Sequence, residues 1–249
     1  MQNDFCKTNG ALYVNGAEKD TARLGSFIKT HSDKIDHIIM TQDNHHVIDI
    51  SHPGFWKDKK GNPPVPFTAI GVEDVRNGTW TPRFPKEEIV NYLQKLEDQG
   101  EFPHVIWPEH CIIGSTGAAI VDEIMQPVMD WARQGNFFDV VVKGTNPLTE
   151  HFGALRANIP IEGSPETQIN TDLIRKLELF DNILITGEAK SHCVANTIKQ
   201  LFEINGIIRK LVIFEDCMSD VTGFETIAVP IYQKAKNEGA RFTKSTEWF

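Results

Sequence analysis

Short apolar runs alternate with longer amphipathic stretches along the chain. The apolar runs predict strands near residues 37–41, 104–107, 139–143, 182–186 and 210–215. The amphipathic stretches predict helices near residues 21–32, 86–98, 118–133, 171–179, 192–204 and 224–237. This alternation is typical of parallel strands joined by crossover helices, so we expect an α/β fold.

Three of the apolar runs lead into residues that can take part in chemistry. Asp43 and His45 follow the first run, Lys143 ends another, and Cys193 follows a third. Ligands of open α/β sheets lie at the carboxyl ends of the strands. We therefore expect these unlike groups to share one cleft.

Cys193 has the most informative context. A predicted strand ends at Gly187, and Ser191 is expected to cap the helix that follows, which puts Cys193 in the first helical turn. Unpaired backbone N–H groups and the helix dipole favour an anion there, so the thiol pKa is expected to fall and the thiolate to act as a nucleophile. The alternative is a buried structural cysteine, because free cysteine packs as a small hydrophobic residue.

Asp43, His45 and His110 are candidate ligands of one divalent cation. A carboxylate with imidazoles suits zinc, iron or manganese. Polar loops also contain an Asp-x-His pair by chance, and His110 alone could be a structural histidine.

Lys143 and three aromatic residues complete the candidates. A lysine that ends a buried strand needs a negative partner, such as a thiolate or a carboxylate, unless it extends to solvent at the sheet edge. Phe55, Trp56 and Trp107 could form the wall of a pocket for a flat ring, or they could serve only in packing.

Four blocks of the chain, which include Asp43, His45, His110 and Cys193, resemble the isochorismatase-like cysteine hydrolases, and within them the nicotinamidase-related amidases. The blocks are Met1–Cys6 with the small residues that follow it, the Asp43/His45 loop, Trp107–Cys111, and Gly187–Thr197. They stand in family order over nearly the whole chain, and Lys143 falls where the family keeps its lysine.

The resemblance implies a Rossmann-like three-layer α/β/α fold with a mostly parallel sheet. It implies Cys193 as nucleophile, Lys143 as its electrostatic partner, and Asp43, His45 and His110 as metal ligands, most plainly for zinc. It further implies a cis bond between Glu188 and Ala189, an oxyanion hole formed by the backbone N–H groups of Ala189 and Cys193, and Phe5 beside Trp107 in the substrate pocket.

The implied reaction is hydrolysis of a small, nicotinamide-like carboxamide to the acid and ammonia, through a thioester and with help from the metal. Two alternatives stay open. One is a related hydrolase of a ureido, carbamoyl or vinyl-ether substrate, and the other is a non-catalytic binding protein that lacks the base.

The chain departs from the family pattern at its start. The family's catalytic aspartate ends the first strand, immediately before the block that opens here at Met1. We expect this chain to lack that central strand, as a fragment or through a start codon placed too late, and to be inactive if the base is absent. Asp4 is a later residue of the block and does not replace it.

A second departure concerns the metal loop. Asp49 stands near the place where many family members carry another histidine, so a fourth protein ligand stays open. The loop continues as an inserted segment of about residues 46–80, which we expect to build a pocket wall or a subunit contact.

Composition adds limits rather than a function. With 249 residues, 40% hydrophobic and 24% charged, the chain suits one domain over 1–249. A net charge of −9 argues against nucleic acid and anionic membranes as partners, and no apolar run reaches the roughly 20 residues of a membrane span. Four cysteines suit reduced thiols in the cytoplasm, with Cys6, Cys111 and Cys217 structural.

A small amide is the expected ligand, and a homo-oligomer the expected assembly. Asp216 and Ser219, after the last predicted strand, are interpreted as structural.

Overall fold

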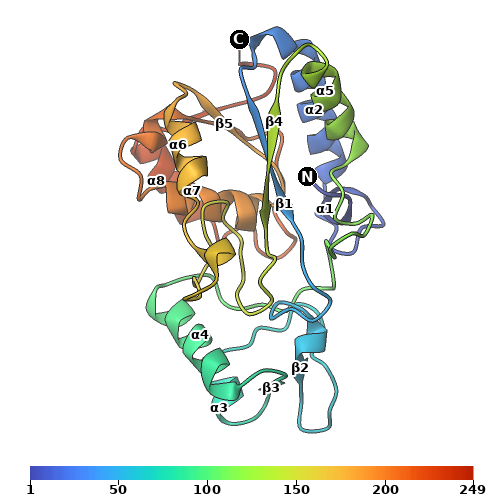
Figure 1. Cartoon of the computed structure of the whole chain (residues 1–249), viewed down its shortest axis with the longest axis vertical. Coiled ribbons are helices and arrows are strands. Elements are labelled where there is room, and N and C mark those ends of the chain that lie inside the picture. The colour runs from blue at the N-terminus through green and yellow to red at the C-terminus, as the bar shows by residue number, and fades with distance from the viewer. Residues whose placement is uncertain (249) are drawn as a thin grey trace.

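The computed structural model describes residues 1–248 and has the predicted α/β architecture (Figure 1). The strands are β1 (Ile38–Asp43), β2 (Trp56–Lys57), β3 (Thr81–Pro82), β4 (Phe138–Lys143), β5 (Ile183–Ile185), β6 (Leu211–Phe214) and β7 (Arg241–Thr243). β1 pairs in parallel with β4, and β5, β6 and β7 form a second parallel sheet, whereas β2 and β3 are antiparallel. The prediction of an α/β fold with mostly parallel strands is confirmed, with the parallel strands divided between two hydrogen-bonded sheets.

Helices flank these strands on two sides (Figure 1). They are α1 (Asn3–Cys6), α2 (Ala17–Thr30), α3 (Val72–Arg76), α4 (Lys86–Asp98), α5 (Asp122–Ala132), α6 (Thr171–Glu178), α7 (Ala195–Leu201) and α8 (Val229–Asn237). Helices α2 and α5 lie together on one side, and α6, α7 and α8 gather on the other. In the part of the chain that the structure describes, no helix has the length and apolar character needed to cross a bilayer.

Strand β6 shows why the layers hold together, because its two faces are buried in different clusters. Leu211 and Ile213 pack with residues of α7 and α8, while Val212 and Phe214 pack against Phe27 of α2. All four residues of β6 are buried, as expected for a parallel strand covered on both faces.

A lower lobe carries the segment predicted as an insertion, together with α3 and α4 (Figure 1). Its core includes Phe55, Trp56, Ile89 and Leu93. The indole N–H of Trp56 donates to the Ile50 carbonyl over 2.7 Å, which fixes the buried ring. That the whole chain forms one domain stays a prediction.

Two predicted elements differ from the structure in kind, and the helices predicted from residues 118 and 224 begin later, at Asp122 and Val229. Residues 104–107 do not form a regular strand: Val105 makes one isolated antiparallel bridge with Ala69, and their other backbone hydrogen bonds go to residues 67–70 and to Ser51. The helix predicted from His192 starts as a π-helical turn, Lys190–Val194, before α7. Ser191 does not cap it: its hydroxyl accepts the backbone N–H of Val221 over 3.0 Å.

Candidate active site and metal centre

The ends of β1 and β4 place two of the predicted residues side by side. Asp43 and Lys143 are register partners on the paired strands, and their side chains form an ion pair. The Lys143 ammonium also donates to the His151 carbonyl over 2.8 Å and lies 3.6 Å from the Cys193 sulfur. Lys143, 3% exposed, thus has the negative partners that its burial requires.

This arrangement sets the charge of the buried ammonium and its partner. Burial works against the charged form of Lys143, but Asp43 and Cys193 raise its pKa above the ordinary lysine value. Burial likewise opposes ionisation of Asp43, yet Lys143 and His45 hold the pKa of that carboxyl below its usual range. The site therefore contains a fixed ammonium–carboxylate pair next to a sulfur.

The predicted metal ligands also come together. One side-chain atom each of Asp43, His45 and His110 lies within 4.8 Å of the others, and all three residues are buried. The rings of His45 and His110 have centroids 4.9 Å apart. A carboxylate and two imidazoles at this spacing make a donor set typical of zinc and related cations.

Hydrogen bonds behind the two histidines test whether this set fits a cation. His45 Nδ1 lies 3.3 Å from an Asp49 carboxylate oxygen, and His110 Nδ1 lies 2.8 Å from the Pro108 carbonyl. Each ring is held through Nδ1, which leaves Nε2 for a metal, and histidine ligands of metals are usually held by a carboxylate or a carbonyl in this way. The residues present therefore fit a divalent cation. His52 adds a third ring, with its Nε2 3.3 Å from His110 Nδ1.

Two residues of the first block support this centre without belonging to it. The Gln2 side chain donates to the Asp43 carbonyl over 2.7 Å and accepts the Asp43 backbone N–H over 2.8 Å. Asp4 instead accepts the backbone N–H groups of Ala11 and Cys111, which gives it a structural role in holding these two segments together. Sequence reasoning missed the role of Gln2, although its position in the block was available as a signal.

Cys193 lies in the π-helical turn after β5, and the peptide bond between Glu188 and Ala189 is cis, as the resemblance implied. Burial raises the pKa of the Cys193 thiol to about 11, while Lys143 and a backbone hydrogen bond from Ala189 work in the opposite direction. The predicted fall in the pKa of this thiol is therefore wrong, because burial outweighs the positive neighbours.

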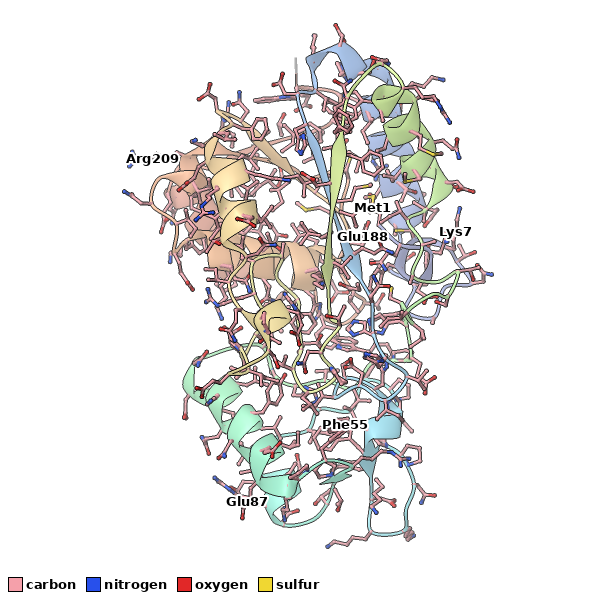
Figure 2. All side chains as sticks on the ribbon, in the orientation of Figure 1. Met1, Lys7, Phe55, Glu87, Glu188 and Arg209 are labelled. Atoms are coloured by element: carbon pink, nitrogen blue, oxygen red, sulfur yellow. The ribbon has the colours of Figure 1, made fainter. Side chains whose placement is uncertain are left out.

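The aromatic residues divide into two groups. Trp107 packs edge-on against His192, with ring centroids 5.0 Å apart, and Phe5 packs against His110 at 5.4 Å. Phe55 and Trp56 instead lie in the core of the lower lobe, 0% and 2% exposed. Figure 2 shows Phe55 there, apart from Glu188 near the Cys193 turn. The structure thus brings Phe5 and Trp107 to the site and does not bring Phe55 or Trp56.

Further rings around His192 were not found by sequence reasoning. Phe102, Phe152 and Phe224 surround its imidazole with centroids 5.1–5.6 Å away. Burial lowers the pKa of His192 to about 4, so its imidazole is neutral. The position next to Cys193 was the only signal available in the sequence.

Two buried polar residues next to Phe152 were also missed. Burial raises the pKa of Glu150 to about 7 and lowers that of His151 to about 3. Glu150 Oε2 and His151 Nε2 have no hydrogen-bond partner within residues 1–248.

Comparison with known proteins gives a consistent set of relatives. No family model matches the chain. It is 24% identical to a nicotinamidase of Saccharomyces cerevisiae over 79% of this chain and 76% of that protein. It is 23% identical to a nicotinamidase of Escherichia coli, over 82% of this chain and 74% of that protein.

Solved structures agree with the sequence relatives. A yeast nicotinamidase bound to the inhibitor nicotinaldehyde superposes with a TM-score of 0.66 at 18% identity, covering 98% of this chain and 96% of that one. A pyrazinamidase of Pyrococcus horikoshii in complex with zinc gives 0.56 at 17% identity, covering 98% and 94%. An isochorismatase-like hydrolase of Alkaliphilus metalliredigens gives 0.51 at 13% identity, covering 99% and 89%. The resemblance seen in the sequence is thereby confirmed: the chain is similar to nicotinamidases in both sequence and fold, and it shares its fold with an isochorismatase-like hydrolase.

Proposed function

We propose that this protein is an amidohydrolase that cleaves a small aromatic carboxamide of the nicotinamide type to the acid and ammonia. The observation that carries the proposal is the convergence of Cys193, Lys143 and Asp43 at the ends of three strand segments, with the Lys143 ammonium 3.6 Å from the Cys193 sulfur. Nicotinamidases among the relatives in both sequence and fold support the same reaction.

Asp43, His45 and His110 would hold a divalent cation, for which zinc is the first candidate. The hydrogen bonds from His45 to Asp49 and from His110 to Pro108 support this, as does the zinc complex of the pyrazinamidase relative. When bound, the cation would supply a positive charge that orients the substrate or a water molecule.

In the proposed mechanism, the Cys193 sulfur attacks the carboxamide carbon, and the carbonyl electron pair moves onto the oxygen. Backbone N–H groups of Ala189 and Cys193 would hold that oxyanion. Collapse of the tetrahedral adduct breaks the C–N bond, and the amine leaves as ammonia after it takes up a proton. Water then hydrolyses the thioester and returns the thiol.

Lys143 would stabilise the thiolate, because its ammonium already lies at the sulfur and is held there by Asp43 and the His151 carbonyl. With its pKa near 11, the thiol must lose its proton to a base during the attack. Phe5, Trp107 and the rings around His192 would form the apolar walls for a flat substrate ring.

The test is ammonia release from nicotinamide and a panel of small amides. It uses the 249-residue chain, and in parallel a chain that carries the in-frame residues upstream of Met1. Zinc-loaded protein should release ammonia in at least one of the two forms. Cys193→Ala should abolish release, because no other group supplies the nucleophile.

Release that survives Cys193→Ala would contradict the assignment of the nucleophile. Folded, metal-loaded protein that releases ammonia from no amide in either form would contradict amide hydrolysis and favour a related hydrolase or a binding protein. Activity that survives exhaustive chelation, with metal loss verified by elemental analysis, would contradict the metal's role.

A further inference from the structure

The turn that carries the proposed oxyanion donor is fastened on both sides of Ala189 by one residue, Ser219. The backbone N–H of Lys190 donates to the Ser219 carbonyl over 2.8 Å. The backbone N–H of Ser219 donates to the Glu188 carboxyl over 3.1 Å. Both neighbours of Ala189 are therefore tied to the same residue of the segment after β6.

Ser219 is in turn anchored to helix α2. Its hydroxyl donates to the Asp20 carboxylate over 2.5 Å. The Cβ of any larger residue at Gly16, where φ is +101°, would lie 2.9 Å from that hydroxyl oxygen, so the approach of the helix start is close. Arg23 pairs with Asp20 over 2.5 Å and also donates to the Asp216 carbonyl, three residues before Ser219.

Asp20 and Glu188 form a buried pair of carboxyl groups, 2% and 7% exposed (Figure 2 labels Glu188). Burial and the adjacent Asp20 raise the pKa of Glu188 well above its usual value, and a carboxyl–carboxyl hydrogen bond contributes. Glu188 is therefore held as the protonated acid beside Asp20. Glu188 Oε2 accepts from Ser219, and the buried Oε1 is the oxygen that can carry the proton and direct it toward Asp20.

We propose that Glu188, Ser219 and Asp20 form a clamp that positions the backbone N–H of Ala189 for the oxyanion. These are positioning residues, since they act through Ala189 and do not contact the reacting atoms. The inference rests on the proposed function, because the oxyanion arises only if the Cys193 sulfur adds to a carbonyl. One oxyanion donor increases kcat by roughly 10²- to 10³-fold. A backbone N–H of Ala189 that is shifted from its position would lose part of this effect.

Two substitutions at one position test the clamp. Glu188→Gln keeps an acceptor for the Ser219 N–H and a donor for Asp20, so it imitates the protonated acid. Glu188→Leu has a similar size and makes neither hydrogen bond. Ser219→Ala is a milder variant, which removes only the bond to Asp20 and serves if Glu188→Leu does not fold.

Three readouts separate the clamp from a general structural role. They are kcat and KM for amide hydrolysis, the affinity for pyridine-3-carbaldehyde, whose addition to a thiolate creates an oxyanion, and the rate of Cys193 modification by methyl methanethiosulfonate, which creates none. We expect Glu188→Leu to lower kcat and aldehyde affinity at least about tenfold, with KM and the modification rate within about twofold. Glu188→Gln should recover most of the loss, and Ser219→Ala should fall between the two.

Unchanged kcat and aldehyde affinity in Glu188→Leu, or an equal loss in Glu188→Gln, would overturn the clamp. A parallel fall in the thiosulfonate rate would also overturn it, since the damage would then lie at Cys193 itself. If the wild type hydrolyses no amide but binds the aldehyde with the expected variant pattern, the proposed function fails and the clamp stands. If the wild type reacts with thiosulfonate but neither binds the aldehyde nor hydrolyses any amide, both fail.

Discussion

At the scale of single residues, the site depends on partners that hold the functional side chains. Asp49 shows this most directly, because it is buried and contacts His45 Nδ1 while it also accepts two hydrogen bonds from Ser51. A carboxylate so fixed orients the imidazole and increases its basicity toward a metal.

We therefore expect Asp49→Ala to weaken zinc binding by about 10- to 100-fold, as is typical when the partner of a metal-ligating histidine is removed. Asp49→Asn retains an oxygen acceptor without the charge, so its loss should be smaller. Competition with a chromogenic zinc chelator measures both affinities. Equal affinities for Asp49→Ala and wild type would show that Asp49 does not support the metal centre.

At the scale of elements, β6 stabilises the sheet of β5, β6 and β7, because it is the middle strand and is buried on both faces. Ile213 is fully buried in the cluster formed with α7 and α8. Its position next to β5 means that its packing also supports the strand that leads to Cys193.

Ile213→Ala should lower the free energy of unfolding by about 2–5 kcal/mol through lost burial and a residual cavity. Ile169→Ala is the matched control: that side chain is 43% exposed, so the same deletion should cost much less. Urea unfolding followed by circular dichroism compares the two. Similar losses in both variants would contradict the central position of β6.

At the scale of the whole molecule, several histidines are buried without charge, and this makes stability depend on pH. His104 is an example in the lower lobe, where burial lowers its pKa to about 4 and its Nε2 lies 3.0 Å from the Ile50 carbonyl. An unfolded chain binds protons on histidine near pH 6.5, whereas folded His104 stays neutral until about pH 4. Stability is therefore full above pH 6.5 and falls as the pH decreases from 6.5 to 4.

At pH 5 the pH lies about 1.5 units below the histidine pKa of the unfolded chain. Protonation of His104 in the unfolded state should therefore lower the free energy of unfolding by about 2 kcal/mol relative to pH 7. His104→Gln lacks the titrating group, so its stability should fall by about 2 kcal/mol less between these two pH values than that of the wild type. Denaturant unfolding at pH 7 and pH 5 gives the change in the free energy of unfolding for each protein. An identical change in variant and wild type would rule out the buried neutral state. The homo-oligomer expected from the sequence stays a prediction, which light scattering can check.

The sequence by itself determined the α/β class, most of the helices and strands, and the residues that gather at the strand ends. These features follow from local periodicity and from the position of Asp43, Lys143 and Cys193 next to apolar runs, which a parallel sheet brings to one edge. Only the tertiary structure decided which rings surround the site, the direction of the Cys193 pKa and the contact between Glu188 and Asp20. Each of these depends on burial and on side chains from distant segments. Phe55 and Phe152 are equally aromatic in the sequence, and only packing sends one to the lower lobe and the other to His192.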